Sequence, residues 1–543
     1  MKKLILGNVT TMNENNMHAD AIVVEDGKIL YVGNKEEAKS LYGNDLQVLD
    51  YSDKYILPGF IEPHSHGIFA GYRALGQLDL SSHGIDYEAY KKDIRQYVKD
   101  NPDFPRYLTC GWSEDGSFFD HNWLDELCSD KPMIMNTCGG HSCLLNKKAM
   151  EVYGINKDYL AKYGKERVHI YDNGELTGYV CEEAAVDLFK FIQPSFEDAK
   201  RYILGWQDIA LSKGYTAVGD AGCELLFKDA SHAYNELDSE KKLKLRTYSW
   251  ILTEDNCEDP VAKVEQIKEI KKQYDGDYYQ VIGSKVFLDG VAEGRTSWTV
   301  DEYCDEKGYY GIQRFNNEER MVTLIAEANK NNFSVHAHSE GDGSTRFMLR
   351  CIKKAQDITN VLDQRNLIAH LHFVQPEDID NMAKTKSIAI VPPLWTPKFK
   401  GGYEPEVKAF GLERSDASYP IKSFVDAGAT IAFHSDYPIS PVLDVVRSLY
   451  MAELRALPDE GWGGVELTQR NPKECINRLQ ALRALTIDAA YALKQENIMG
   501  SIEVGKIANF TVYDQDILNI KVEDVINAKL LKTIVDGEEV YSI

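Results

Sequence analysis

Short apolar runs near both ends of the chain predict β-strands. The N-terminal runs cover residues 3–7, 20–25, 28–33, 46–51 and 54–57, and the C-terminal runs cover residues 508–514, 531–535 and 538–541. Asp26-Gly27 and Asp536-Gly537 each separate two such runs, which indicates hairpin turns. Because neither end has enough strands for a stable sheet alone, we expect residues 1–57 and 500–543 to form one small β-sandwich domain together.

The middle of the chain alternates strand and helix patterns. Strand-like runs cover residues 106–111, 132–137, 215–219, 244–252, 281–288, 333–338, 367–373, 387–392 and 429–434. The clearest helical pattern is 196–213, with Ser195 at the N-cap position and Gly214 just after the end. The alternation predicts an α/β fold in which residues 58–499 form a (β/α)8 TIM-type barrel. Residues 67–200 exceed any ordinary connection, so we expect an insertion there over the barrel mouth.

The charge balance narrows the class of partner. The chain has 61 Lys and Arg against 85 Asp and Glu, a net charge of −24, whereas nucleic acids and anionic membranes attract basic patches. No apolar run approaches the ~18 residues of a membrane span, and the N-terminus lacks the apolar core of a secretory signal. The ten cysteines include no C-x-x-C pair, which favours reduced thiols over a thiolate zinc site. We therefore expect a cytoplasmic protein that acts on a small molecule.

Histidines cluster far beyond chance. The 13 histidines would produce about 0.3 H-x-H pairs at random, yet three pairs occur. The pairs are His64/His66, His336/His338 and His370/His372. Residues i and i+2 of a strand point to the same face, so each pair would project together. Imidazole is a common ligand of Zn²⁺, Fe²⁺ and Ni²⁺, and the pairs therefore predict a metal site.

Asp436 and Lys285 are two further candidates for the predicted metal site. Asp436 directly follows an apolar strand in AFHSDYP (432–438), where a barrel strand delivers a reactive side chain, although turn and helix-cap aspartates also occur there. Lys285 lies within the apolar stretch GSKVFLDG (283–290), where it could simply pair with Asp289. Near metal ions its ammonium would be repelled, so it would have to be neutral or be converted by CO₂ into a bridging carbamate.

Several motifs occur in a fixed order along the chain. They are LPGFIEPHSH (57–66), SKVFLDG (284–290), HSEGD (338–342), IAHLHFV (368–374), HSDYP (434–438) and GSIEVGKIANFTVYD (500–514). Two more, HSCLLNKKAM (141–150) and TGYVCEEA (177–184), lie in the expected insertion. Together they resemble the third amidohydrolase family of the amidohydrolase superfamily, a group that includes YtcJ-like proteins and N-substituted formamide deformylases. The resemblance covers essentially the full chain and implies a distorted (β/α)8 barrel with a β-sandwich made from both termini.

The resemblance also implies a set of metal ligands. These are His64, His66, Lys285, His338, His370 and Asp436. His64 and His66 would bind the more buried ion, and His338 and His370 would bind the second ion. Lys285 could be carboxylated and bridge both ions. We expect Zn²⁺, with one or two ions per chain.

The expected reaction is hydrolysis of a C–N bond in an amide, formamide or related small molecule. A metal-activated hydroxide would attack the carbonyl, and Asp436 would carry the water proton to the leaving nitrogen. The second metal, or a catalytic donor such as His141, would polarise the carbonyl. Arg295 could bind a substrate carboxylate or form an ordinary surface ion pair. The residues expected to bind substrate are Trp112, Glu182, Asp289, Arg295, His336 and Trp395.

Departures from the family pattern leave the substrate open. Ala369 replaces a common Glu, and His434 replaces a Gly before the last Ser-Asp. One alternative is an aminohydrolase that deaminates a heterocycle, but it would need an H-x-x-E motif, and Glu340 lies only two residues after His338. Hydrolysis of a cyclic amide, a carbamate or an N-acyl amino acid is a second alternative, and a binding protein on the same fold is a third. We expect a homodimer, since two-fold dimers are the commonest oligomers.

Overall fold

The chain folds into two compact units. The computed structural model describes residues 2–43, 46–83, 86–112, 119–137, 142–165, 167–181, 183–188, 193–225, 227–292, 294–400, 402–458 and 464–543. The first unit comprises Met1–His66, Gln207–Leu225 and Tyr234–Ile543. The second unit comprises Gly67–Trp206 and Leu226–Ala233.

The first unit contains an eight-stranded parallel sheet that curves into a barrel. In spatial order its strands are β5 (Phe60–Ser65), β12 (Tyr215–Ala221), β13 (Arg246–Leu252), β14 (Tyr279–Phe287), β15 (Ser334–Ser339), β16 (Leu367–His370), β17 (Ile388–Val391) and β18 (Ile431–Phe433). Every neighbouring pair is parallel, and the spatial order follows the chain order. This confirms the predicted TIM-type barrel, in which reactive side chains gather at the carboxyl ends of the strands.

Helices alternate with the barrel strands, as the sequence pattern predicted. They are α8 (Phe196–Ser212), η2 (Cys223–Leu225), α9 (Ala230–Ser239), α10 (Pro260–Tyr274), α11 (Glu318–Lys330), α12 (Asp342–Thr359), α13 (Pro376–Thr385), η3 (Pro393–Trp395), α14 (Tyr403–Phe410), α15 (Leu412–Asp416), α16 (Ile421–Asp426), α17 (Val445–Leu454), α18 (Gly464–Thr468), η4 (Pro472–Glu474), α19 (Arg478–Ala484) and α20 (Ile487–Ala492). Helix α8 begins where the Ser195 hydroxyl accepts from the Asp198 N–H at 3.1 Å, and Gly214 follows its end at φ +87°.

Side chains of the barrel strands form a buried apolar core. Trp250, Ile61, Leu367 and Ile390 are at most 2% exposed and belong to one cluster. Trp250 also donates from its indole N–H to the Ser334 hydroxyl at 2.9 Å, so its single polar atom is satisfied.

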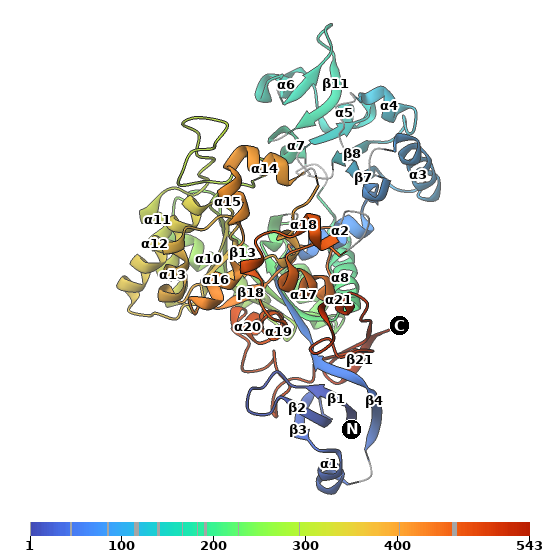
Figure 1. Cartoon of the computed structure of the whole chain (residues 1–543). Coiled ribbons are helices and arrows are strands. Elements are labelled where there is room, and N and C mark those ends of the chain that lie inside the picture. Colours follow the sequence, from blue (N-terminus) through green and yellow to red (C-terminus); the bar gives the residue numbers. More distant parts are fainter. Residues whose placement is uncertain are drawn as a thin grey trace. The chain divides into compact units, whose positions relative to one another are not determined.

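Both ends of the chain contribute to one seven-stranded sheet. Its order is β21 (Glu538–Ser542), β20 (Leu530–Val535), β19 (Phe510–Tyr513), β4 (Gln47–Pro58), β1 (Lys3–Thr10), β2 (His18–Glu25) and β3 (Lys28–Gly33), with α1 (Lys35–Tyr42) and α21 (Val522–Val525) beside the strands in sequence. Strand β4 pairs in parallel with β1 and antiparallel with β19, which joins the blue and red parts of Figure 1. The expectation that the two ends combine is confirmed. Strand β4 ends at Pro58 and β5 begins at Phe60, so the sheet leads directly into the barrel.

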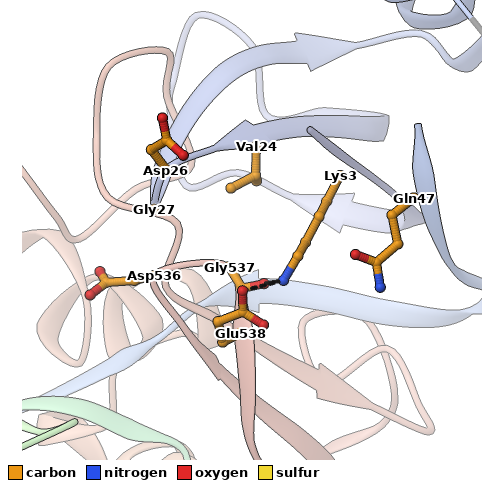
Figure 2. A pocket seen from close by; sticks show the side chains of 8 residues that line it. All are labelled: Lys3, Val24, Asp26, Gly27, Gln47, Asp536, Gly537 and Glu538. Atoms are coloured by element: carbon orange, nitrogen blue, oxygen red, sulfur yellow. Dashed lines mark hydrogen bonds and ion pairs between the residues drawn. The ribbon is translucent and has the colours of Figure 1, made fainter. Parts of the chain in front are cut away.

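The two Asp-Gly turns meet in this sheet around a small polar pocket. Gly27 and Gly537 both have φ +76°, which suits glycine at hairpin turns, and both turns bond to Ala508. The pocket has a volume of about 340 Å³ (Figure 2). Lys3 donates to the carbonyl oxygen of Gly537 at 2.8 Å and pairs with Glu538, so the cation of the pocket is already partnered.

The second unit has its own six-stranded sheet. Its order is β10 (Val168–Ile170), β11 (Leu176–Cys181), β9 (Ser142–Leu145), β8 (Met133–Thr137), β7 (Tyr107–Trp112) and β6 (Leu78–Asp79). The strands predicted at 106–111 and 132–137 lie in this sheet, within the insertion expected at residues 67–200. The helices are α2 (Gly67–Leu75), η1 (Ser81–His83), α3 (Tyr87–Asp100), α4 (His121–Asp125), α5 (Lys147–Tyr153), α6 (Lys157–Tyr163) and α7 (Glu183–Leu188).

The helices and cysteines of the described residues bear on the expectations about membrane spans and disulfides. None of their helices combines the length and apolarity that crossing a bilayer requires. The nine cysteines within the described ranges are all free.

Candidate metal centre at the barrel strand ends

Three side chains from the first and last barrel strands converge. His64 lies on β5, His66 follows it, and Asp436 follows β18. Oδ1 of Asp436 lies 3.1 Å from Nε2 of His64 and 3.3 Å from Nε2 of His66. Among the described histidines, cysteines and acids, these are the one group of three whose ligand atoms all lie within 4.8 Å of one another.

The chemistry of this group fits a divalent cation. His64 is fully buried and Asp436 is 5% exposed. Nε2 of His64 and Oδ1 of Asp436 are buried, and neither makes a well-directed hydrogen bond despite their proximity. Buried polar atoms without such bonds are costly, and convergent imidazole and carboxylate donors are the usual ligands of Zn²⁺. The residues present therefore fit the ion that the sequence predicted.

Electrostatics keep His64 and Asp436 in the ionisation states that a metal requires. Burial lowers the pKa of His64 well below its ordinary value, and the nearby Lys285 lowers it further, so the imidazole is neutral. Burial alone would raise the pKa of Asp436, but the contact with His66 and the surrounding histidines outweigh burial and hold that pKa below its ordinary value. A neutral His64 imidazole and an ionised Asp436 carboxylate are ready to bind a cation.

Lys285, His338 and His370 lie beside this group. His338 and His370 have ring centroids 4.4 Å apart, and the His370 ring is 5.0 Å from that of His64. The Nζ of Lys285 is buried without a hydrogen-bond partner, and burial lowers the pKa of this lysine to about 7. Near neutral pH a large fraction of the amine is therefore uncharged, which is the form that reacts with CO₂.

Two further buried histidines, His336 and His434, lie against His64. Nε2 of His336 lies 2.8 Å from Nδ1 of His64, and its ring stands edge-on to Trp250. His434 is 2% exposed, its ring centroid lies 5.0 Å from those of both His64 and His370, and neither of its nitrogens has a hydrogen-bond partner. Burial lowers the pKa of His434 to about 4, so it is neutral.

The pair His370/His372 does not project together, which corrects the sequence prediction. Strand β16 ends at His370, and both His370 and Leu371 have positive φ, at 78° and 54°. The chain therefore turns sharply, and the His372 side chain contacts Glu340 and Glu406. Positive φ is rare for residues other than glycine, and nothing in the motif IAHLHFV signals it.

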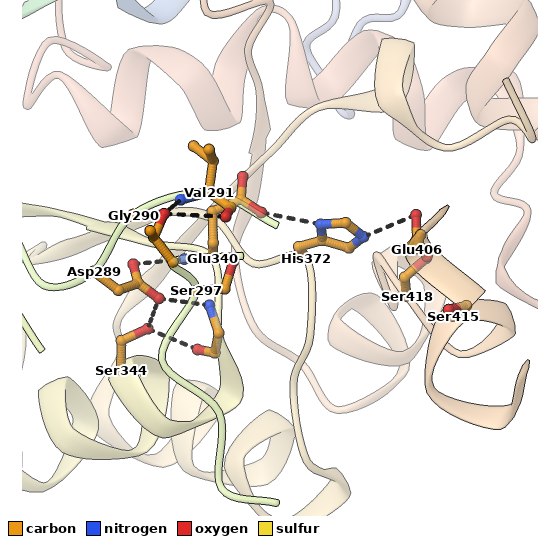
Figure 3. Close-up of polar contacts among 12 residues, drawn as sticks. Asp289, Gly290, Val291, Ser297, Glu340, Ser344, His372, Glu406, Ser415 and Ser418 are labelled. Carbon is orange, nitrogen blue, oxygen red and sulfur yellow. Dashed lines mark hydrogen bonds and ion pairs between the residues drawn. The ribbon is translucent and has the colours of Figure 1, made fainter. Parts of the chain in front are cut away.

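His372 instead lies in a buried chain of charges (Figure 3). Its Nδ1 is 3.0 Å from the Glu340 carboxylate, its Nε2 is 3.5 Å from Glu406, and Arg470 contacts Glu406 at 3.1 Å. Burial alone would lower the pKa of His372, but Glu340 and Glu406 outweigh burial and raise it to about 9. His372 is thus a cation between two anions.

Asp289 fixes the loop that follows β15. Its carboxylate accepts hydrogen bonds from the backbone N–H of Glu340, Gly341 and Trp298 and from the Ser344 hydroxyl, at 2.7–3.1 Å. Burial raises its pKa to about 7 in spite of these bonds. A fully buried carboxyl with four such bonds holds this loop in place, and its Oδ1 also lies 3.6 Å from Nε2 of His338.

The other expected substrate contacts fall in different places. Trp395 stacks on His370 at 5.6 Å between centroids, with the rings 6° apart. The Arg295 guanidinium pairs with Asp305 and Glu306, each at 2.8 Å. Trp112 lies in the second unit, where it is 2% exposed and packs against Phe119 and Tyr179. His141 and Glu182 lie outside the described residues.

Comparison with known proteins gives consistent results along the whole chain. The family model "Amidohydro_3: Amidohydrolase family" matches residues 47–541. Putative amidohydrolase YtcJ of Bacillus subtilis is 26% identical over 98% of both chains, and the N-substituted formamide deformylase of Arthrobacter pascens is 23% identical over 98% of this chain and 97% of its own. Protein LONG AFTER FAR-RED 3 of Arabidopsis thaliana is 25% identical over 98% of this chain and 90% of its own.

Solved structures share the fold. A metal-dependent hydrolase of Pyrococcus furiosus superposes with a TM-score of 0.75 at 21% identity and covers 95% of this chain and 99% of its own. A Pyrococcus horikoshii metal-dependent hydrolase gives a TM-score of 0.76 at 21% identity, covering 96% and 99%. With a family match that spans nearly all of its length, this chain belongs to the amidohydrolase family and is an amidohydrolase.

Proposed function

We propose that the protein hydrolyses a C–N bond in an amide or formamide of a small molecule, with one or two divalent metal ions, most simply Zn²⁺. The convergence of His64, His66 and Asp436 is the observation that carries this proposal. The similarity to a formamide deformylase and to a putative amidohydrolase supports the reaction class.

His64, His66 and Asp436 would hold one ion, and His338, His370 and a carboxylated Lys285 would complete a second position. A bound divalent ion would supply acidity to water and positive charge near the substrate carbonyl. The first strand and the strand after which Asp436 lies bring their groups from opposite edges of the sheet, so the barrel itself assembles the ligands.

Asp436 is the proton carrier in this proposal. Its pKa is held below the ordinary value, so its carboxylate is ionised and can accept a proton from the attacking water. It can then return that proton to the leaving nitrogen. The indole of Trp395, stacked on His370, would cover the reacting groups from water on that side.

The geometry of Glu340 argues against deamination of a heterocycle. Such chemistry needs a carboxyl after the fifth strand that delivers protons to the ring. Glu340 is 3% exposed, and its carboxylate is bound to the cation of His372 at 3.0 Å. A carboxylate paired with a buried cation is a poor proton donor, since the pair stabilises its ionised form. Hydrolysis of a cyclic amide or an N-acyl amino acid uses the same groups and differs only in the substrate.

Metal content and turnover together test the proposal. Elemental mass spectrometry on protein grown with Zn²⁺ and bicarbonate should give one or two ions per chain, fewer in His64→Asn and Lys285→Ala, and no change in His18→Asn, which removes an exposed histidine of β2. Hydrolysis of a panel of formamides and N-acyl amines should stop on chelation and return with Zn²⁺. Absence of metal from the wild-type protein would refute the proposal.

A further inference from the structure

The barrel has a seam between its first and last strands. The sheet begins at β5 and ends at β18, and the described residues of these two strands share no backbone ladder. His64 and His66 stand on one side of this seam and Asp436 on the other. The spacing of the proposed ligands therefore depends on whatever links the two edges.

The side chain of Glu62 crosses the seam. One carboxyl oxygen accepts from the backbone N–H of His64 at 3.2 Å, and the other accepts from the backbone N–H of Ser435 at 2.9 Å. Glu62 is 1% exposed, so no water competes for these bonds. One bonded residue is itself a proposed ligand, and the other directly precedes one.

A second link lies beside it. The backbone N–H of His66 donates to the carbonyl oxygen of Tyr437 at 2.9 Å. The two links flank Asp436 on both sides in sequence, so the position of its carboxylate relative to both histidines is fixed across the seam. Glu62 is not one of the three converging groups, and each of its carboxyl oxygens already accepts a backbone hydrogen bond.

We propose that Glu62 is a positioning residue that clasps the seam of the barrel and thereby sets the distance from His64 and His66 to Asp436. The inference rests on the proposed metal centre for its functional consequence, whereas the clasp itself is independent of any ion. Groups that orient metal ligands from behind typically change metal affinity by about 10–100-fold when they are altered.

Glu62→Gln is the sharpest perturbation. The amide keeps the size of the carboxyl but replaces one accepting oxygen with a donating NH₂ group. Burial raises the pKa of Glu62 to about 8, so the variants are compared above that pH, where both oxygens of the wild-type carboxylate accept. Whichever way the amide is turned, one of the two backbone N–H groups then faces a donor. Glu474→Gln is the matched control, because Glu474 is half-buried and its carboxyl accepts from the Ser423 N–H at 2.9 Å, in α16 and not at the carboxyl ends of the barrel strands.

Two measurements separate the clasp from the metal centre. Hydrogen exchange of the peptide around Ser435 should be at least tenfold faster in Glu62→Gln than in the wild type and the control, with or without metal. Binding of Co²⁺, followed by its absorption spectrum and by competition with a chelator, should weaken at least tenfold with an altered spectrum. Glu62→Asp, which is too short to reach both N–H groups, should behave in the same way if the first variant does not fold.

Each outcome decides a separate point. Unchanged exchange in a folded variant overturns the clasp. Faster exchange with unchanged Co²⁺ affinity and spectrum overturns the positioning role and leaves Glu62 as a structural link alone. If wild-type protein binds no Co²⁺, the proposed function fails, while the exchange measurement still tests the clasp.

Discussion

Removal of one charge from the buried chain around His372 tests how the segment after β17 is held. Glu406 lies on α14 and touches two cations, His372 at 3.5 Å and Arg470 at 3.1 Å. The His372 ring is also stacked between Phe373 and Tyr419, at 4.2 and 4.4 Å between centroids. Glu406→Gln keeps the shape of the side chain and leaves two buried cations with the single anion Glu340.

The expected cost follows from these distances. Coulomb's law at an effective dielectric constant of ~20 gives about 5 kcal/mol for each of the two contacts of Glu406. The two figures do not add, because His372 can lose its proton, and return of its pKa from about 9 to the ordinary 6.5 limits its share to about 3 kcal/mol. Arg470 cannot discharge in this way. Breaking one partner of a buried ion pair costs about 3–5 kcal/mol, and we expect that loss in the opening free energy of α14.

Hydrogen exchange of the α14 amides measures this loss directly. A decrease of about 3–5 kcal/mol corresponds to exchange that is roughly 150- to 5,000-fold faster, provided that opening is in rapid equilibrium. Glu404→Gln is the control, since it removes the same charge from an exposed position of the same helix and should change stability by less than about 0.5 kcal/mol. Equal exchange in the two variants would refute the claim that the charge chain holds α14.

Three further predictions follow from the same geometry. Because the pKa of His372 is raised to about 9, its stabilising contribution should be complete below pH 6.5 and should disappear as the pH rises through 9; thermal unfolding midpoints should fall over this window in the wild type and much less in Glu406→Gln. Asp436→Asn should leave circular dichroism unchanged and lower kcat by orders of magnitude, and near-native turnover would remove Asp436 from the proton-transfer role. Arg295→Ala should leave KM within about twofold, because the guanidinium is bound to Asp305 and Glu306; a tenfold rise in KM would instead assign it to a substrate carboxylate.

The barrel could be predicted because each unit of the pattern is local. A buried parallel strand is a continuous apolar run, and a covering helix has its own caps, as the Ser195 hydroxyl shows for α8. The strands at 106–111 and 132–137 have the same local pattern, yet they pair in the sheet of the second unit. Local pattern shows that a strand exists, whereas its sheet is decided by packing between distant segments.

The group of His64, His66 and Asp436 could be predicted from the sequence for a similar reason. His64 and His66 are two residues apart at the end of one strand, so they share a direction, and Asp436 follows the strand that completes the barrel. The failure at His372 came from the same rule. Alternation applies only while the strand continues, and the positive φ of His370 and Leu371 ends it between the two histidines.

Glu62 shows what sequence reasoning could have found and did not. It lies two residues before His64 on the same strand, so the alternation that places His64 in the barrel also places Glu62 there. Its partner Ser435 lies 373 residues further along the chain. A pattern along one strand can therefore identify the carboxyl, but only closure of the barrel shows that its two oxygens join the strand carrying the histidines to the strand that precedes Asp436. The same closure that assembles the proposed ligands also supplies the hydrogen bonds that hold them in register. Glu62→Gln is therefore expected to weaken metal binding although Glu62 is not itself a proposed ligand.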